Sequence, residues 1–432
     1  MKIAISGATG YIGKHLTSFL TGQGHEITAL KRNLFKEEAF AQLLRQIDGC
    51  VVIINLAGAP INKRWNDEYK QELYNSRVLV TRQLVKAISS LEQKPQLLIS
   101  TSAVGYYSNK GIHDEDHNVR GQGFLANLCH FWEEEAKQCP PEVRTVIVRL
   151  GVVLSSDGGA MSKMLFPLKL TRTSTIIGSG KQAFPWIGLN DLCRAFAFII
   201  DHPTMEGAFN ITAPQLITQK YLAEALGRSA HALLTMSIPS IVFKILYGEG
   251  AAFLTSGQSV VPARLSAAGF NYQTPTIEEL LEIPDHTTIS RLDIGRYMGL
   301  WYEIARYENR FERGIENATA HYALQPDGTI QVENSGYKKG VLKRAIGRAK
   351  QPDKQQPGKL KVSFFYNFYS DYYILELDEK DYNYALIGSS SDNYLWILAR
   401  TPQLPEETLN EILRKALARR YDTSKLIFTQ NR

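Results

Sequence analysis

Gly7-Ala8-Thr9-Gly10-Tyr11-Ile12-Gly13 is the stretch around which most of the chain is organised. The apolar run Ile3-Ala4-Ile5 precedes it, and the residues that follow place four apolar side chains on one helical face: Ile12, Leu16, Phe19 and Leu20. Glycines let a backbone approach a pyrophosphate closely, and a helix N-terminus offers it free N–H groups. The spacing is G-x-x-G-x-x-G instead of G-x-G-x-x-G, so the prediction of a nucleotide site depends on the flanking strand and helix.

The composition is that of an ordinary globular protein. Of the 432 residues, 44% are hydrophobic and 21% charged, and the net charge of +6 is too modest to indicate nucleic-acid binding. No apolar run approaches the ~20 residues of a membrane helix, and no export signal is recognised. None of the cysteines forms a C-x-x-C pair, which favours reduced thiols in a cytoplasmic protein: Cys50, Cys129, Cys139 and Cys193.

Strands and helices alternate through the first 150 residues. Residues 26–30 form a predicted second strand, and residues 50–58 an apolar run that ends in small residues, as strands buried on both faces do. A helical stretch covers about residues 66–91, and further buried strands are expected at 96–100 and 144–154. This alternation predicts an α/β fold with a doubly wound, Rossmann-type parallel sheet and a small substrate lobe.

The end of the second strand bears on the choice of cofactor. In dinucleotide folds an acidic residue there binds the 2′-hydroxyl of NAD, whereas a basic one accommodates the 2′-phosphate of NADP. This chain has Lys31 and Arg32 and no acid, which favours NADP; the alternative is a solvated strand end. Ala57 and Gly58, at the end of the next strand, leave room for the cofactor.

Several motifs together resemble the extended short-chain dehydrogenase/reductase superfamily. They are the glycine loop, Asn55-Leu56-Ala57-Gly58 and Ser102-Ala103-Val104-Gly105-Tyr106-Tyr107. Arg64-Trp65-Asn66, residues 178–187 and a C-terminal signature at about 240–281 narrow the resemblance to epimerase-family proteins of unknown substrate. The resemblance implies an NADP site lined by Lys31, Arg32, Leu56, Ala57, Glu72 and Arg77.

The residues for proton transfer depart from the superfamily pattern. The superfamily uses a Ser and a Tyr-x-x-x-Lys pair, in which the Lys lowers the pKa of a phenol that is ordinarily near 10. Ser102 occupies the place of the Ser, but Phe124 and Leu128 stand where the Tyr and Lys belong. Tyr106 or Tyr107 is therefore a candidate substitute proton donor; the alternative is that both pack against the substrate lobe.

Two polar clusters have no assigned chemistry. Residues 113–117 (His-Asp-Glu-Asp-His) resemble a metal motif, but adjacent residues of one loop rarely converge on one ion. We expect a solvated loop and no metal site. Residues 132–135 (Trp-Glu-Glu-Glu) are interpreted as an exposed helix with one buried aromatic side chain.

The pattern changes near residue 282, where a short polar link with a proline begins. Beyond it, short alternating strands separated by turn residues predict an antiparallel barrel, and residues 405–419 an amphipathic helix. This part resembles a bacterial lipocalin of the apolipoprotein D-like branch, through the Gly299-Leu300-Trp301 motif and residues 395–400. The resemblance implies eight strands, a Trp301–Arg400 contact that closes the base, and a fatty acid or lysophospholipid as ligand. A basic stretch at residues 338–348 is interpreted as a solvated hairpin, the alternative being contact with anionic lipid headgroups.

We therefore expect an NADP-binding epimerase-like domain at residues 1–282, a linker at 283–292 and a lipocalin domain at 293–432. One hypothesis is an NADP-dependent oxidoreductase or epimerase with a small-molecule substrate, joined to a lipid-binding barrel. The other is a catalytically silent NADP-binding scaffold joined to a lipid carrier. Ser102 and the glycine loop favour the first, and the missing Tyr-Lys pair favours the second.

Overall fold

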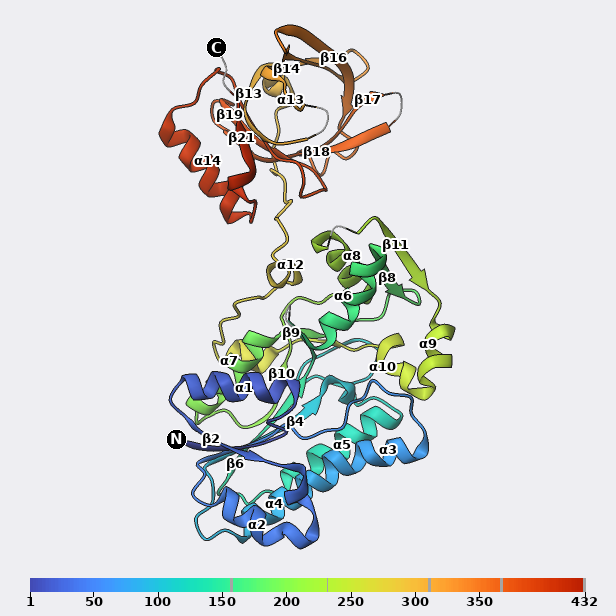
Figure 1. The fold of residues 1–432 in the computed structure, drawn as a ribbon, viewed down its shortest axis with the longest axis vertical. Coiled ribbons are helices and arrows are strands. Elements are labelled where there is room, and N and C mark those ends of the chain that lie inside the picture. The colour runs from blue at the N-terminus through green and yellow to red at the C-terminus, as the bar shows by residue number, and fades with distance from the viewer. Residues whose placement is uncertain (156–157, 231, 310–311, 366–367, 430–432) are drawn as a thin grey trace. The chain divides into compact units, whose positions relative to one another are not determined.

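The computed structural model divides into two compact units, Met1–Leu281 and Glu282–Arg432. It describes residues 1–155, 158–230, 232–309, 312–365 and 368–429 (Figure 1). Within these residues, none of the helices combines the length and the apolar character that crossing a membrane requires.

A six-stranded parallel sheet forms the centre of the first unit, in the order β10-β6-β4-β3-β1-β2. The strands are β1 (Lys2–Ser6), β2 (Glu26–Leu30), β3 (Val52–Asn55), β4 (Leu97–Ala103), β6 (Arg144–Leu150) and β10 (Gly207–Ile211). Strand order reverses beside β1, which pairs with β2 on one side and β3 on the other. This is the doubly wound arrangement in which ligands bind at the carboxyl ends of the strands, and it confirms the predicted fold class.

Helices cover both faces of this sheet (Figure 1). The side chains of Ile3 and Ile5 lie in a core with α1 (Tyr11–Gly22) and α7 (Leu189–Asp201). Ala4, which points the other way, lies in a second core with α2 (Phe40–Ile47) and α4 (Val80–Ser90). The period-2 alternation of β1 thus accounts for the two layers.

Two expected elements are interrupted. The helix expected at residues 66–91 is divided into α3 (Asp67–Tyr74), a π-helical stretch (Asn75–Leu79) and α4. The strand expected at 144–154 ends at Leu150, and β7 (Val152–Ser155) pairs with β9 (Trp186–Gly188) in a separate sheet. The backbone changes course at Gly151, where a Cβ would lie 3.0 Å from the carbonyl oxygen of Pro185.

A smaller lobe is built from segments that leave the sheet. Its two-stranded parallel sheet pairs β8 (Thr173–Ile177) with β11 (Leu234–Ile238), and α8 (Gln219–Ser229) packs on it. The remaining lobe helices are α6 (Gly159–Thr171), α9 (Ser240–Tyr247) and α10 (Ala252–Thr255). The unit is completed by α5 (Phe124–Lys137), β5 (Ile112–His113), β12 (Ser259–Val260), α11 (Ala263–Ala267) and α12 (Ile277–Leu280).

The second unit is a closed antiparallel barrel, as predicted. Neighbours in sequence pair from β13 to β20, and β20 pairs with β13 to close it. The strands are β13 (Gly299–Tyr307), β14 (Glu316–Leu324), β15 (Ile330–Lys338), β16 (Val341–Lys350), β17 (Lys359–Phe365), β18 (Phe368–Leu377), β19 (Tyr384–Gly388) and β20 (Trp396–Ala399). Helix α13 (Ile294–Tyr297) precedes them; α14 (Glu406–Ala418) and β21 (Leu426–Phe428) follow. One apolar cluster contains Trp301, and a second joins the barrel wall to α14 through Ile412 and Ala416.

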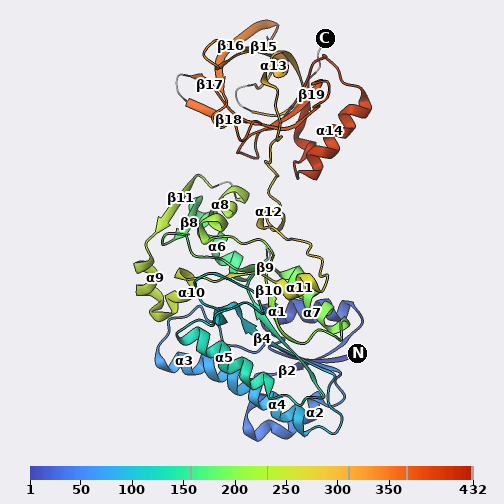
Figure 2. The same cartoon turned by 180° about the vertical axis from the view of Figure 1, so that it is seen from behind.

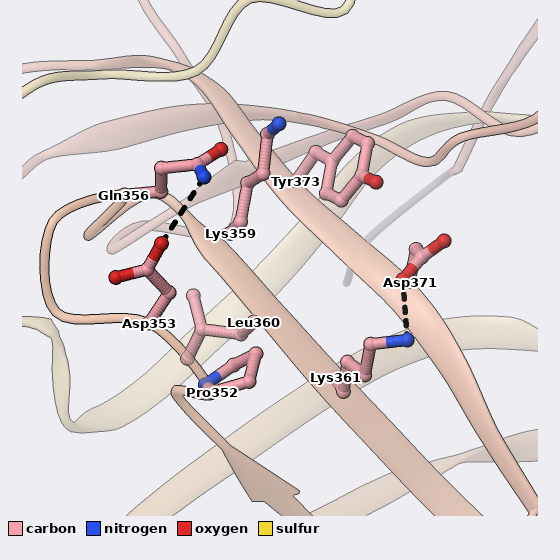
Figure 3. Close-up of a pocket in the computed structure, with 8 residues that line it drawn as sticks. All are labelled: Pro352, Asp353, Gln356, Lys359, Leu360, Lys361, Asp371 and Tyr373. Atoms are coloured by element: carbon pink, nitrogen blue, oxygen red, sulfur yellow. Dashed lines mark hydrogen bonds and ion pairs between the residues drawn. The ribbon is translucent and has the colours of Figure 1, made fainter.

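A shallow hollow of about 210 Å³ lies on strands β17 and β18 (Figure 3). Lys361 and Asp371 on its wall form an ion pair of 3.3 Å, and the amide of Gln356 donates to Asp353 across 3.1 Å. Lys361 and Asp371 thus pair with each other, Lys359 lies 5.5 Å from the ring of Tyr373, and the chemistry predicted from the sequence lies in the first unit.

Candidate functional site

The glycine loop makes a turn between β1 and α1 that leaves no space for side chains. Gly7 has a φ of +72°, and the amide of Gly10 donates to the Gly7 carbonyl across 2.9 Å. A Cβ on Gly7 would lie 2.8 Å from the carbonyl oxygen of Leu56, and one on Gly13 would overlap the carbonyl of Gly7. Gly10 caps α1 without a side-chain hydrogen bond, so the first-turn N–H groups remain available to an anion. The loop therefore fits the pyrophosphate of a dinucleotide.

The remaining loop residues surround this turn. Thr9 is exposed, and Ile12 is half-buried in the first turn of α1. The ring of Tyr11 lies against Gly158 and Gly159, where added Cβ atoms would come within 2.7 and 2.8 Å of it. Tyr11 therefore joins the glycine loop to the start of α6.

The end of β3 is held by a buried asparagine. Asn55 accepts a hydrogen bond of 2.5 Å from the Ser6 hydroxyl and donates one of 2.8 Å to the Thr81 hydroxyl. The amide of Ala57 donates to the same Asn55 oxygen across 3.3 Å. Leu56, Ala57 and Gly58 are thus fixed beside the glycine loop.

Arg77 supports this segment from behind. Its guanidinium donates to the Ala59 carbonyl across 2.9 Å, lies 5.5 Å from the Trp132 ring and would be 3.0 Å from a Cβ on Gly58. Burial lowers the pKa of Arg77. Because Arg77 belongs to the π-helical stretch, this irregular turn is what directs its side chain at Gly58.

The basic residues after β2 are exposed. Lys31 lies in solvent, and Arg32, whose side chain is 82% exposed, forms an ion pair of 3.3 Å with Glu72 of α3. Arg32, Glu72 and Arg77, which the resemblance placed at the cofactor, come from the turn after β2, from α3 and from the π-helical stretch. An exposed cation at the end of β2 fits a 2′-phosphate better than a ribose hydroxyl.

Ser102, at the carboxyl end of β4, belongs to a buried charged network. Its hydroxyl donates to Glu133 of α5 across 2.7 Å, and Glu133 accepts two bonds of 2.9 and 2.8 Å from Arg149 of β6. All three residues are no more than 6% exposed. The proton of Ser102 is thus committed to a carboxylate, which leaves the oxygen lone pairs, and no donor, for a substrate.

The two candidate tyrosines lie in different environments. The Tyr107 hydroxyl accepts a bond of 2.7 Å from Arg149 and donates one of 2.7 Å to Asn210, and the residue is 1% exposed. Burial raises the pKa of Tyr107, and Arg149 only partly offsets this. Tyr106 is half-buried, its ring lies 3.9 Å from the Arg149 guanidinium, and its hydroxyl takes no part in this network.

An apolar core occupies the place of the missing Tyr-Lys pair. Leu128 packs with Trp65, Tyr69, Leu73 and Trp132, and Phe124 lies against this cluster with its ring 5.5 Å from that of Trp65. The thiol of the neighbouring Cys129 is buried, which raises its pKa to about 12. Positions 124 and 128 of this helix therefore supply no group able to exchange a proton.

The charged residues of this network were not found from the sequence. The segment at 132–135 is not simply an exposed helix, because Glu133 is 2% exposed and pairs with Arg149. Cys129, Trp132, Glu133 and Ala136 recur at helical spacing on one buried face, and this periodicity was the available signal.

The segment at 113–117 is also not simply a solvated loop. His113 is 3% exposed, and Glu115, which is 7% exposed, accepts hydrogen bonds from the backbone amides of Asn210 and Arg264. Burial raises the pKa of Glu115. Among the described residues, no group of three or more His, Cys, Asp or Glu side chains is placed to hold a metal ion.

At the base of the barrel, the Arg400 guanidinium lies 4.0 Å from the ring of Trp301, which is fully buried. Arg400 also donates to the carbonyls of Leu300 and Arg296 across 2.9 and 2.6 Å. Gly299 has a φ of +93°, and a Cβ there would lie 3.5 Å from Arg400. The contact joins the start of β13 to the residue that follows β20.

Three buried tyrosines bond to one another in the same core. The Tyr372 hydroxyl lies 2.7 Å from that of Tyr297 and 3.1 Å from that of Tyr322. Burial raises the pKa of all three, that of Tyr322 to about 12. This part of the core is polar but uncharged.

Family models match successive parts of the chain. That of the NAD dependent epimerase/dehydratase family matches residues 3–212, and a domain of unknown function (DUF1731) matches residues 238–282. A lipocalin-like domain matches residues 292–431.

Curated relatives cover the first two-thirds of the chain. The mouse epimerase family protein SDR39U1 is 36% identical over 290 residues and the human protein 34% over 293, each across 65% of this chain and 99% of the relative. A chloroplastic SDR39U1 homolog of Arabidopsis thaliana is 33% identical over 299 residues, across 65% of this chain and 86% of the relative.

Solved structures agree with these relatives. Human SDR39U1 (isoform 2), crystallised with NADPH, is 32% identical with a TM-score of 0.60, over 65% of this chain and 98% of that one. The UDP-glucuronic acid 4-epimerase of Bacillus cereus is 17% identical with a TM-score of 0.53, over 65% and 97%, which shows a shared fold. The chain therefore belongs to the epimerase family that includes SDR39U1, and it carries a lipocalin-like domain after that family's C-terminal segment.

Proposed function

We propose that the first unit binds NADPH and exchanges a hydride with a small-molecule carbonyl or alcohol, as an oxidoreductase or epimerase. The observation that carries this proposal is the glycine cradle, in which Gly7 and Gly13 leave no room for a Cβ and α1 begins without a side-chain cap. The NADPH in the crystal of human SDR39U1 supports the choice of cofactor. In this assignment residues 1–282 bind the cofactor, 283–292 link, and 293–432 form the barrel of a cytoplasmic protein.

Each part of the cofactor has candidate partners in this chain. The amides of the glycine loop and of the first turn of α1 would hold the pyrophosphate, and Lys31 and Arg32 the 2′-phosphate. Leu56, Ala57 and Gly58 would flank the cofactor, and Arg77 would keep Gly58 in place. Bound NADPH supplies the hydride; the rest of the chemistry is proton movement, for which the protein must provide a group.

Tyr106 is the residue we assign to that proton movement. Its neighbour Tyr107 has both hydroxyl functions engaged by Arg149 and Asn210, whereas the Tyr106 hydroxyl lies outside that network. The guanidinium of Arg149, 3.9 Å from the Tyr106 ring, would stabilise the phenolate that remains after proton donation. Ser102, whose proton is held by Glu133, would accept a hydrogen bond from the hydroxyl of the alcohol form of the substrate.

The lipocalin-like unit would hold an apolar ligand, such as a fatty acid or lysophospholipid, in its eight-stranded barrel. A covalent link raises the effective concentration of one unit near the other, so a ligand released by the barrel would reach the first unit readily. Apolar substrates are therefore the first class to test.

A second candidate function is a redox-silent NADP-binding scaffold joined to a lipid carrier. The specific observation in its favour is that Phe124 and Leu128 fill the place of the Tyr-Lys pair with a packed apolar core. Under this alternative the protein binds NADPH but catalyses no reaction with it.

An assay of NADPH oxidation distinguishes the enzyme from the scaffold. Full-length protein is tested with a panel of medium- and long-chain aldehydes and ketones as substrates. We expect turnover to fall about 100-fold or more in Tyr106→Phe, the low end for loss of a general acid, and to change less than about threefold in Tyr107→Phe. Equal rates in wild type, Ser102→Ala and Tyr106→Phe would overturn the enzyme proposal. Mass spectrometry of co-purifying small molecules tests the cofactor and barrel ligand independently of turnover.

A further inference from the structure

Helix α9 has its apolar side chains on the outside. In this fully described helix no residue is buried, and Ile241, Val242, Ile245 and Leu246 are between 39% and 65% exposed. Phe243 and Tyr247, on the side toward the protein, are only half-buried. A surface helix of a globular domain ordinarily shows the opposite pattern, with its aliphatic stripe toward the core.

The apolar surface continues onto the strand that leads into α9. Leu234 and Met236 of β11 are 62% and 56% exposed, and strand alternation puts both on the same sheet face. On the neighbouring strand β8, Ser174 donates to the Ala223 carbonyl of α8, so the other face of this sheet is the one toward α8. On β11 that face carries the polar residues Thr235 and Ser237. At the start of β11, the amide of Leu233, itself 68% exposed, donates to the carbonyl of Arg172 at the end of α6.

The exposed side of α6 has the same character. Lys163, Phe166 and Leu170 recur at helical spacing, and Phe166 and Leu170 are 69% and 74% exposed. Both ribbon views place β11 and α9 at the outer margin of the first unit (Figure 1, Figure 2). We call the surface of α9, β11 and the exposed side of α6 the lobe face. Contiguous exposed apolar surface of this kind marks an interaction site.

The charge of the lobe face indicates what covers it. Residues 158–190 and 225–248 contain no Asp or Glu, although the chain has 43 acidic residues. The cations Lys163, Arg172, Lys181 and Lys244 of these segments are all exposed. Glu249, just after α9, is exposed and pairs with Lys70. A surface whose own elements carry aliphatic side chains and cations but no acidic residue is complementary to the interface of an anionic lipid bilayer, where aliphatic groups enter the acyl boundary and cations meet headgroups.

We propose that the lobe face docks the protein on anionic membrane surfaces. Ile241, Ile245 and Leu246 would enter the headgroup–acyl boundary, with Lys244 at the lipid phosphates. A protein partner would require complementary acidic groups and a shaped surface, whereas a bilayer requires only apolar side chains and positive charge. None of the residues of the lobe face is among those assigned to NADPH or to proton movement, so the inference does not depend on the proposed NADPH chemistry.

Co-sedimentation of full-length protein with vesicles tests the proposal. The vesicles would be phosphatidylcholine alone, or phosphatidylcholine with about a third phosphatidylserine, at low salt. We expect binding only to the mixed vesicles, a loss of at least about tenfold in the double variant Ile245→Glu and Leu246→Glu, and of about fivefold in Lys244→Gln. The matched control is Val119→Glu, which alters an equally exposed aliphatic residue (63%) elsewhere in the same unit and should bind like wild type.

Further measurements keep the result interpretable. The urea concentration at which each variant unfolds is measured first. We expect it to equal that of the wild type, because the substituted positions are exposed. Equal binding to both vesicle types, or binding that the lobe-face variants leave unchanged, would overturn the proposal. The second result would assign vesicle binding to another surface, such as the basic hairpin of β15 and β16. A dimer in light scattering that dissociates in the double variant, without vesicle binding by wild type, would show instead that a second copy covers the lobe face.

Discussion

The two ends of the candidate site in the first unit are built in opposite ways. At the glycine loop the side chains are missing, and backbone amides and the first turn of α1 remain open to a ligand. At the end of β4 the side chains are present but engaged, because Ser102, Glu133, Arg149 and Tyr107 bond to one another in the interior. The first end is organised for ligand binding, whereas the side chains of the second end mainly bond to one another and stabilise the fold. Family membership therefore predicts the cofactor more securely than the reaction.

The largest expected effect is at the second end. Glu133→Gln leaves Arg149 buried without its counter-charge, so we expect the free energy of unfolding to fall by about 3–5 kcal/mol. The matched control is Glu134→Gln, the next residue of α5, whose exposed pair with Lys137 contributes less than about 1 kcal/mol. Urea unfolding measures both, and equal small losses would contradict a structural role for the network.

Gly13→Ala tests the first end. The added Cβ would overlap the Gly7 carbonyl and move the loop, so we expect NADPH affinity to fall on the order of 100-fold, or about 3 kcal/mol. Gly22→Ala, in the last turn of the same helix, adds a Cβ that meets nothing within 4 Å and should leave the affinity unchanged. Fluorescence titration with NADPH compares them; wild-type affinity in Gly13→Ala would show that the loop does not hold the cofactor.

A smaller effect is expected at the choice between NADPH and NADH. Arg32→Ala removes the exposed cation after β2, and we expect NADPH affinity to fall about tenfold while NADH affinity stays within about twofold. Lys36→Ala, another exposed cation a few residues further on, serves as the control. If the affinities for both cofactors decline together in Arg32→Ala, the residue supports the fold and does not recognise the 2′-phosphate.

The smallest effect concerns pH. Burial raises the pKa of Tyr107, so the folded state keeps this proton to higher pH than the unfolded chain, whose phenols titrate near 10. The stability from this difference is present below about pH 10 and is lost as the pH rises through the folded-state pKa, by about 1.4 kcal/mol for each unit of difference. Tyr107→Phe should therefore flatten the decline in urea stability above pH 10.

Tyr74→Phe, in the same unit, is the control for the loss of a phenolic hydroxyl at a half-buried position. The contrary result would be an inflection near neutral pH in the pH profile of turnover that disappears in Tyr107→Phe. That inflection would show a lowered pKa of Tyr107 and would make this residue the proton donor.

Much of the fold was predictable because it depends on local patterns. The alternation of apolar runs with helical periodicity predicted the parallel sheet, and the short alternating strands after residue 282 predicted the barrel. The interruptions at Asn75–Leu79 and at Gly151 were not predictable. Each depends on a contact with a distant segment: Arg77 with Gly58, and Gly151 with Pro185.

By itself, the sequence determined the order of elements, the glycine loop and the absence of the Tyr-Lys pair, since these are properties of spacing and residue type. Only the tertiary structure decided which polar groups meet. Ser102, Glu133 and Arg149 come from β4, α5 and β6, and no local pattern reports that their side chains share one buried space. The outward aliphatic side of α9 is a similar case: the periodicity of the sequence identifies a helix face, but only the packing shows whether that face is covered.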